Sequence, residues 1–547
     1  MGVLVLLGMV ACERAPRCER LFVGGVVHTL AGARRLEIAV TGGRIVALVE
    51  PDNEASWRRA AAEVVDLAGA HVYPGFTESH GHLTGYGAAL EQVDLRGAGS
   101  FAEVVSRVKT AAAKLPGESW VIGRGWDQNL WPEKRFPTHA ALSAAVPDHP
   151  ALLRRVDGHA VITNARGLIL AGIGAATPDP SGGRIIRDQA GAPTGALVDT
   201  AVELLDRAVP APSAADVERR IVLGTQHLAA FGICEIHDAG TTRAELDVLS
   251  RLQHEGRLPI RVYVMLDGGD DAMLANQLGS GPRVSRDGML TVRAVKLFAD
   301  GALGSRGALL SEPYDDEPST RGLAVTAPAR LAQVIREAAQ AGFQPCVHAI
   351  GDAAVTHVLD IYERELGHGG RNLRPRIEHA QIVRPEDVPR FAALGVVASV
   401  QPTHCTSDMP WAPARLGERR IAWAYRWQSL LHAGAHLALG SDVPVESPDP
   451  RLGLWAAVTR RPPEGTPPAP WNPGEALSLT DAVAGYTSWA AYAGFEEDWR
   501  GDLAPTFAAD LTVLDRDLAG KEAQILQAHV VRTVVGGRDI VVTGGAR

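Results

Sequence analysis

Residues 71–83 read His-Val-Tyr-Pro-Gly-Phe-Thr-Glu-Ser-His-Gly-His-Leu, and the organisation of the whole chain follows from this stretch. A short apolar run leads through a Pro-Gly pair to His80 and His82. Residues i and i+2 of a strand point to the same side, so both imidazoles can meet at one point, and Gly81 leaves room for a close approach. Two neutral imidazoles on one cation are a common start to a transition-metal site. An isolated His-x-His is more often a pair of surface histidines, so the later chain has to decide.

Eight short apolar runs alternate with helix-length segments over most of the chain. Continuous apolar strands separated by helices are typical of a parallel sheet with both faces covered. Eight such units predict an α/β fold, a closed (β/α)8 barrel of the TIM type, over residues 71–499. The predicted strands are the run that leads to His80 and then Ile233–Ile236, Ile260–Leu266, Val292–Phe298, Gln344–Ala349, Pro375–Ile377, Val396–Val400 and His436–Leu439. Helices are predicted at Arg243–His254, Pro328–Ala341, Ala353–Glu365 and Arg426–Ala433.

The two chain ends share a strand-like character. Short apolar runs punctuated by Gly24-Gly25 and Gly42-Gly43 fill residues 20–70, and similar runs occur near 510–515 and 530–538. Chain ends usually lie close together in space. Residues 20–70 and 500–547 therefore predict one composite β-sandwich domain.

An insertion of mixed helical and loop character is predicted after the first barrel strand, at about residues 100–215. It holds two polar-aromatic clusters, Gly123–Gln128 and Arg154–His159. Trp126 and Asp127 suit a substrate pocket, which needs an apolar wall and a few fixed polar groups. A loop held by an Arg–Asp pair explains the same residues equally well.

Composition and the N-terminus limit the partners and the compartment. A formal net charge of −9 over 547 residues argues against a nucleic-acid partner. Residues 1–19 contain an apolar run too short to span a bilayer, and Met9-Val10-Ala11-Cys12 resembles a bacterial lipobox with Cys12 as the lipidated residue. No Lys or Arg precedes the run, so a signal or lipoprotein segment and an irregular start both stay open. A cytoplasmic location is slightly favoured over a cell-envelope lipoprotein.

Polar residues stand at the carboxyl ends of the predicted barrel strands, where a barrel of this kind holds its active site. Each alone has a simpler explanation, such as a hydrogen-bonded core histidine or a helix N-cap. Together they exceed the ligands of one tetrahedral zinc and suit two cations that share a bridging ligand. They are His80, His82, Lys296, His348, His379 and Asp442.

Lys296 is the unusual member of this set, because a lysine in an apolar strand is costly unless it is paired or chemically changed. A lysine held neutral by its surroundings can add carbon dioxide and become a carbamate, an anionic bridge between two cations. A mononuclear site with unmodified Lys296 is the alternative.

Motifs along nearly the whole chain carry a family resemblance. They are Pro74-Gly75-Phe76 with His80-Gly81-His82, Lys296–Gly301 running into Gly304-Ser305-Arg306, His348–Asp352, Glu378–Gln381, Gln401–His404 with Ser407-Asp408-Met409, and Gly440–Glu446. In these motifs the chain resembles the metal-dependent amidohydrolase superfamily, and within it the amidohydrolase 3 family, which includes YtcJ-like proteins and N-substituted formamide deformylases. It departs from the family at Pro505–Asp510, where Gly-Lys before Ala-Asp is usual, and at Gly307, where a threonine is common.

The resemblance implies that His80 and His82 bind the more buried metal and that His348 and His379 bind the second. Carboxylated Lys296 would bridge them, with carbon dioxide as its source, and Asp442 would complete the first site. The metal is expected to be divalent, most simply zinc, with one or two ions per chain.

The resemblance also implies a reaction. A metal-activated hydroxide would cleave a non-peptide C–N bond in a small amide, N-acyl or formamide-like molecule, and Asp442 would carry the proton to the leaving amine. Substrate contacts are expected from Trp126, Asp127, Arg306 and His404. Hydrolysis of an ester or lactone at the same site, and a metal-binding module without turnover, are the alternatives. A homodimer would be unsurprising.

Overall fold

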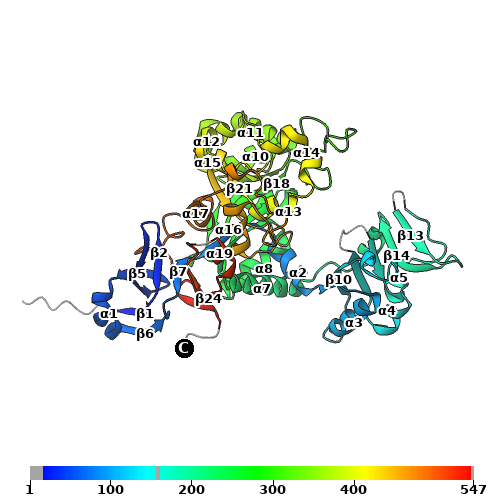
Figure 1. The fold of residues 1–547 in the computed structure, drawn as a ribbon, viewed down its shortest axis with the longest axis horizontal. Helices are drawn as coiled ribbons and strands as arrows, with labels where there is room; N and C mark the ends of the chain where they lie inside the picture. Colours follow the sequence, from blue (N-terminus) through cyan, green and yellow to red (C-terminus); the bar gives the residue numbers. More distant parts are fainter. Residues whose placement is uncertain (1–16, 156–159, 181–182, 521, 544–547) are drawn as a thin grey trace, which may run out of the picture. The chain divides into compact units, whose positions relative to one another are not determined.

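The computed structural model describes residues 17–155, 160–180, 183–520 and 522–543. These residues belong to two compact units, one built from residues 1–86 and 221–547 and the other from residues 87–220 (Figure 1). Cys12, the possible site of a lipid anchor, lies outside the described residues, as do residues 156–159 of the second polar-aromatic cluster.

Eight parallel strands form the centre of the first unit. Each pairs with its neighbour in chain order, and all eight match strands predicted from the sequence. The predicted (β/α)8 barrel is therefore confirmed. Its strands are β8 (Phe76–Gly81), β15 (Ile233–Thr241), β16 (Arg261–Asp267), β18 (Leu290–Phe298), β19 (Gln344–Ala349), β20 (Arg376–His379), β21 (Val397–Val400) and β22 (His436–Leu439).

The ring of strands closes between β22 and β8. Backbone hydrogen bonds run from the Asp442 N–H to His80 O at 2.8 Å and from the His82 N–H to Val443 O at 2.7 Å. A Cβ atom added to Gly81 would lie 2.7 Å from Val443 Cγ1, so this closure needs a glycine at position 81. The predicted close approach at Gly81 is therefore present, and it joins the first and last barrel strands.

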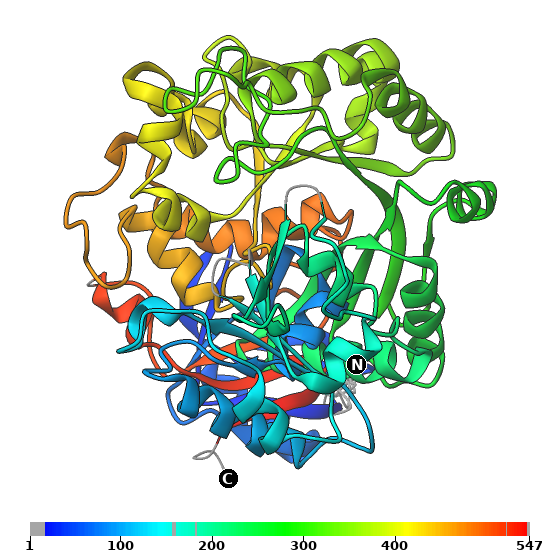
Figure 2. The same ribbon diagram turned by 90° about the vertical axis from the view of Figure 1, so that its right-hand side faces the viewer.

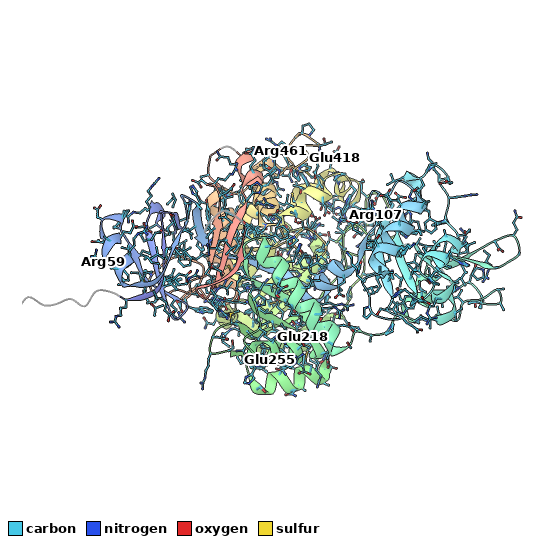
Figure 3. All side chains as sticks on the ribbon, turned by 90° about the horizontal axis from the view of Figure 1, so that it is seen from below. Arg59, Arg107, Glu218, Glu255, Glu418 and Arg461 are labelled. Atoms are coloured by element: carbon cyan, nitrogen blue, oxygen red, sulfur yellow. The ribbon has the colours of Figure 1, made fainter. Side chains whose placement is uncertain are left out.

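Amphipathic helices cover the outside of the barrel, as the green and yellow-green ribbons of Figure 2 show. In α10 the buried residues Leu331, Val334, Ile335 and Ala338 follow the i, i+3, i+4, i+7 spacing of one helix face. Charged side chains such as Glu255, at the end of α8, project from the exposed side (Figure 3). The main outer helices are α7 (Ala214–Ala230), α8 (Arg243–His254), α9 (Asp271–Ser280), α10 (Pro328–Gln340), α11 (Asp352–Leu366), α12 (Val388–Leu394), α15 (Trp427–His432), α16 (Pro450–Thr459), α17 (Leu479–Tyr486) and α18 (Ser488–Ala493).

Two further sheets combine the chain ends. One has the order β5-β4-β1-β6, all from the N-terminal end, and the other has the order β25-β24-β23-β7-β2-β3, in which the C-terminal strand β23 pairs with the N-terminal strand β7. Side chains from both ends, among them Phe22, Val72, Leu511 and Val534, pack into one core. The predicted β-domain made from both chain ends is confirmed. Its strands are β1 (Cys18–Val23), β2 (Val26–Thr29), β3 (Gly32–Arg35), β4 (Glu37–Thr41), β5 (Arg44–Val49), β6 (Ala61–Asp66), β7 (His71–Pro74), β23 (Leu511–Leu514), β24 (Val530–Val535) and β25 (Arg538–Val542).

The second unit lies in the chain between β8 and β15, where the sequence predicts the insertion. Its sheet has the order β13-β14-β12-β11-β10-β9. Trp126 and Trp131 are central to its core, with rings stacked at 5.8 Å. Its elements are β9 (Val93–Asp94), α3 (Phe101–Ala112), β10 (Val121–Trp126), α4 (Ala140–Ala145), β11 (Ala151–Arg155), β12 (Ala160–Thr163), α5 (Ala165–Leu170), β13 (Gly183–Arg187), β14 (Pro193–Asp199) and α6 (Val202–Asp206).

Among the described residues, no helix has both the length and the apolar character that crossing a bilayer would need.

Candidate metal centre

His80 and His82 converge on one carboxylate, as their spacing predicts. His80 is the second-last residue of the buried strand β8 (Phe76–Gly81), and His82 follows the strand directly. The Nε2 atoms of His80 and His82 lie 3.6 Å and 3.2 Å from Asp442 Oδ1. The two rings stand almost perpendicular, with centroids 5.6 Å apart. The end of β22 thus brings Asp442 to the two histidines across the closure of the barrel.

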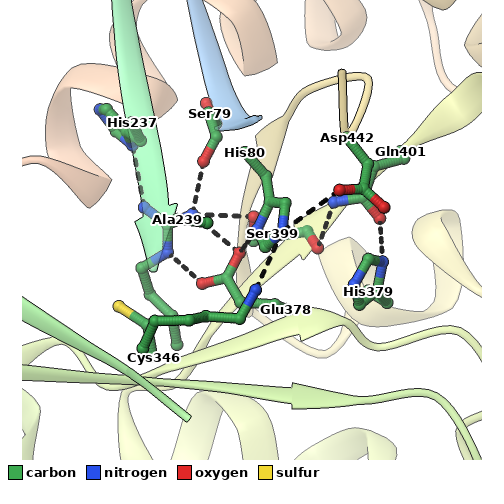
Figure 4. Close-up of polar contacts among 12 residues, drawn as sticks. Ser79, His80, His237, Ala239, Cys346, Glu378, His379, Ser399, Gln401 and Asp442 are labelled. Atoms are coloured by element: carbon green, nitrogen blue, oxygen red, sulfur yellow. Dashed lines mark hydrogen bonds and ion pairs between the residues drawn. The ribbon is translucent and has the colours of Figure 1, made fainter. Parts of the chain in front are cut away.

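The outer nitrogen of each of these rings is fixed by an acceptor. His80 Nδ1 lies 2.5 Å from Glu378 Oε2 (Figure 4). His82 Nδ1 lies 2.8 Å from the backbone oxygen of Ala239. Carboxylate and carbonyl oxygens only accept hydrogen bonds, so both Nδ1 atoms carry the proton. The Nε2 lone pairs are left facing Asp442, which is the tautomer that a metal ligand requires.

His379 is oriented in the same way. Its Nδ1 donates to Gln401 Oε1 at 2.8 Å, which leaves Nε2 with a lone pair. Its ring lies 5.1 Å from that of His80 and 4.5 Å from that of His348, between centroids. The predicted second pair of histidines, His348 and His379, is therefore brought together beside the first.

Asp300, just after β18, holds the segment that follows His348 at the end of β19. Its buried carboxylate accepts three backbone N–H groups, from Leu309, Ile350 and Gly351, at 2.8 to 3.0 Å. His348 Nε2 lies 3.6 Å from the same carboxylate. The ends of β18 and β19 are thereby locked to each other beside the His348 ring.

Lys296 is buried at the centre of this group, with 1% of its surface exposed. Its ammonium nitrogen lies 3.1 Å from His80 Nε2 and 4.8 Å from the centroid of the Phe298 ring. It forms no ion pair with a carboxylate of the described residues. Burial lowers the pKa of Lys296, against the opposing effect of Glu378 and Asp442. A lysine in this position is closer to its neutral form than a surface lysine, as carbamate formation requires.

Asp442 occupies an unusual backbone conformation. Its φ is +60°, and that of His379 is +74°, in the left-handed region that non-glycine residues rarely adopt. Such conformations persist where the surrounding structure enforces them, and they gather at functional sites. Burial would raise the pKa of Asp442, but its contact with His82, and then the nearness of His80, His379 and His404, hold it well below its usual range. Asp442 is therefore an anion at neutral pH.

Burial keeps the histidines neutral. It lowers the pKa of His80 to about 4 and that of His348 to about 3, and the positive charge of Lys296 acts in the same direction. The pKa of His379 is also well below its ordinary value, first through burial and then through His348. Neutral imidazoles are the form that binds metal ions.

Ligand atoms of two groups lie within 4.8 Å of one another, and both groups include Asp442. One contains His80 and His82, and the other contains His379 and His404. His404 Nε2 is buried, without a hydrogen-bond partner, 3.8 Å from Asp442 Oδ2. His404 was expected to contact substrate, and the structure places it among the potential ligands. Nitrogen and oxygen donors in this arrangement fit divalent transition-metal ions.

Glu378 and Arg376 join the site although neither was among the predicted site residues, and Glu378 appeared only as part of a family motif. Arg376 donates to Glu378 Oε1 at 2.7 Å and to Oε2 at 3.0 Å, and both side chains are fully buried. Burial alone would raise the pKa of Glu378, but Arg376 and then His80 hold it well below its usual value. Glu378 is therefore an anionic acceptor for His80. The signal that could have found it is the one that marked Lys296, a charge inside an apolar strand.

The remaining predicted substrate residues have partners of their own. The Trp126 indole N–H donates to Leu153 O at 2.7 Å inside the core of the second unit, and Asp127 pairs with Arg155 at 3.0 Å. Arg306 pairs with Asp316 at 3.0 Å. Their part in substrate binding stays a prediction.

Comparisons with known proteins show the family of the chain. The sequence model described as "Amidohydrolase family" matches residues 63–541. YtcJ of Bacillus subtilis (strain 168) is 34% identical, with 95% of this chain and 99% of that protein covered. N-substituted formamide deformylase of Arthrobacter pascens is 29% identical, with 91% and 94% covered. The crystal structure of an uncharacterised metal-dependent hydrolase from Pyrococcus horikoshii OT3 superposes with a TM-score of 0.78 at 31% identity, over 92% of this chain and 99% of that one.

The family match covers residues 63–541, a range that includes the converging histidines, Lys296 and Asp442. The chain belongs to the amidohydrolase family of hydrolases.

Proposed function

We propose that the chain hydrolyses a non-peptide C–N bond in a small amide, N-acyl or formamide-like molecule. The observation that carries this proposal is the convergence of neutral imidazoles on the anionic carboxylate of Asp442, beside the buried Lys296. The likeness to an enzyme named for N-substituted formamides supports the bond type.

Two cations fit the donor groups, with His80 and His82 on one and His348 and His379 on the other. Lys296, as a carbamate, would bridge them, and Asp442 would bind the first. A mononuclear centre with unmodified Lys296 is the simpler arrangement of the same residues. Zinc is the metal that best suits nitrogen ligands with a carboxylate. When bound, such cations lower the pKa of water and polarise a carbonyl group.

Asp442 is placed to move the proton that the reaction transfers. Hydrolysis of an amide adds water to the carbonyl carbon, breaks the C–N bond and delivers a proton to the departing nitrogen. Asp442 is ionised and has 11% of its side chain exposed, so it can accept a proton from water and still reach substrate. Its Oδ1 contacts both His80 and His82, which fix the carboxylate in place.

Phe298 and Val445 supply an apolar surface next to these groups. The Phe298 ring lies 5.5 Å from that of His348, and 37% of Phe298 is exposed. Val445 follows Asp442 by three residues and is 64% exposed. Exposed apolar side chains beside a polar centre favour a substrate with an apolar substituent on the acyl group or on the nitrogen.

A substrate panel tests the proposal. The zinc-loaded chain is assayed with N-substituted formamides, N-acyl amines, and esters and lactones of matched acyl groups. We expect turnover of the amides that falls when His80 is replaced by Asn. Turnover of the esters and lactones alone would replace the proposal with the ester-hydrolase alternative. No turnover of any of them by a chain that holds metal would favour a binding module.

A further inference from the structure

The β-domain contains a second cluster of metal-ligand side chains, none of which belongs to the set at the ends of the barrel strands. It consists of His28 on β2, His71 on β7 and Asp517 after β23. Strands β2 and β7 pair in parallel with Val26 opposite His71, so His28 and His71 lie on the same face of the sheet. Strand β23 pairs with β7 so that Leu514 lies opposite His71, and Asp517 follows three residues later.

The three side chains meet closely. His28 Nε2 lies 2.9 Å from His71 Nδ1 and 3.9 Å from Asp517 Oδ1. One ligand atom from each of the three residues can be chosen so that all lie within 4.8 Å of one another. Ring nitrogens this close cannot both carry a proton, so at least one lone pair points into the cluster. A histidine–histidine hydrogen bond explains the first contact, but it does not explain why a carboxylate is held beside the pair.

Asp517 is fixed by groups outside the cluster. The Tyr73 hydroxyl and the Ala519 N–H donate to Asp517 Oδ1, at 2.8 and 2.9 Å. Tyr73 is itself held, because it accepts from the Leu518 N–H at 3.0 Å, and its ring stacks on His28 at 4.0 Å. Outer hydrogen bonds of this kind orient ligands around a metal ion.

A cavity opens beside the cluster. Its volume is about 290 Å³, and His28, Tyr73 and Asp517 are part of its lining, together with apolar side chains of α17 such as Val483. Water molecules could therefore complete the coordination of a cation that the three side chains hold.

We propose that His28, His71 and Asp517 form a binding site for a divalent transition-metal ion of the zinc class, separate from the barrel centre. Two imidazoles and one carboxylate form a common three-ligand set for zinc, with water at the fourth position. The ion would tie the segment after β23 to β2 and β7, so its role is to stabilise the β-domain. The inference does not depend on the reaction proposed for the barrel.

Equilibrium dialysis of the metal-free full-length chain against Zn²⁺ alone at pH 7 tests this site. We expect His71→Ala to bind one zinc fewer per chain than the wild type. His254→Ala removes an exposed histidine at the end of α8 and should leave the zinc content unchanged. Equal zinc content in His71→Ala and wild type would overturn the proposal.

Asp517→Asn is a second test variant in case His71→Ala loses zinc through misfolding. It keeps the shape of the side chain but removes its charge. Its zinc affinity at this site should fall about tenfold or more, with an unchanged circular dichroism spectrum. Unchanged affinity in this variant would also overturn the proposal. Amide turnover, measured on the same His71→Ala sample, reports on the barrel alone, so a failure of the proposed reaction and a failure of this site are distinguishable.

Discussion

At the residue scale, Asp442 has two proposed roles, to bind metal and to transfer a proton. Asp442→Asn keeps an oxygen ligand beside His80 and His82 but removes the basic carboxylate. We expect turnover to fall about 10²- to 10⁴-fold, the usual contribution of a general acid–base group, while the metal content stays near that of the wild type. Steady-state kinetics and elemental analysis of one sample measure both. Wild-type turnover in this variant would exclude Asp442 from proton transfer.

Lys296 gives a second prediction at this scale. Because its amine is buried without an ion-pair partner among the described residues, we expect the metal-loaded chain to take up ¹³C-bicarbonate as a carbamate. The measurement is a carbamate carbonyl signal in the ¹³C NMR spectrum that is missing from Lys296→Met. A spectrum without this signal, from a chain that still turns over substrate, would favour the mononuclear centre.

Individual site residues could be predicted where the sequence places them at strand ends, as for His80, His348 and Asp442. Their partners could not be predicted, because Glu378 lies 298 residues from His80 and meets it only across the folded barrel. His404 was expected, from the family resemblance, to contact substrate. Only the folded helix α13 (Pro402–Asp408) brings it to Asp442.

At the scale of elements, the closure between β8 and β22 depends on Gly81. Gly81→Ala would place a methyl group 2.7 Å from Val443 Cγ1 and 3.0 Å from Ile236 Cδ1. We expect a loss of about 1–3 kcal/mol in the free energy of unfolding, the typical cost of overpacking, measured by urea denaturation. Gly279→Ala in α9 is the matched control, since a methyl group there meets no atom within 4 Å. Equal stability of the two variants would show that the closure tolerates a side chain.

A buried ion network joins the barrel to the β-domain. Asp510, just before β23, accepts from Arg261 on β16 at 2.8 and 2.9 Å and from Arg500 at 2.9 Å. Arg500 also pairs with Glu235 on β15. Asp510→Asn would leave buried positive charge poorly compensated, so we expect a loss of about 3–5 kcal/mol in unfolding free energy. Turnover per bound metal should stay at the wild-type value, and a selective loss of turnover would show that this network acts on the site.

The barrel strands could be predicted because their apolar runs are continuous. The residues at which the strands end were predicted less accurately. Strand β15 was expected to stop at Ile236 and continues to Thr241. The extension contains His237 and Asp238, which read as polar loop residues in the sequence. Both are buried, with Arg376 bonded to His237 and the Leu83 N–H bonded to Asp238. Partners that distant in sequence cannot be seen from a local pattern.

At the scale of the whole molecule, the barrel and the β-domain share one compact unit, so metal binding should stabilise both together. We expect removal of metal by a chelator to abolish turnover and to lower the melting temperature, because a ligand that binds only the folded state shifts unfolding by mass action. Differential scanning calorimetry before and after Zn²⁺ is restored measures the shift. An unchanged melting temperature after complete metal removal would contradict this coupling.

The most direct test of the barrel centre compares metal content in two full-length chains by elemental mass spectrometry. One is the wild type and the other carries His80→Asn and His82→Asn together. The difference counts the ions that depend on these histidines, and it is independent of the β-domain site. We predict a difference of one to two zinc-class ions per chain, with turnover lost in the double variant. Equal metal content, with turnover retained, would contradict a metal-dependent hydrolase centred on His80 and His82.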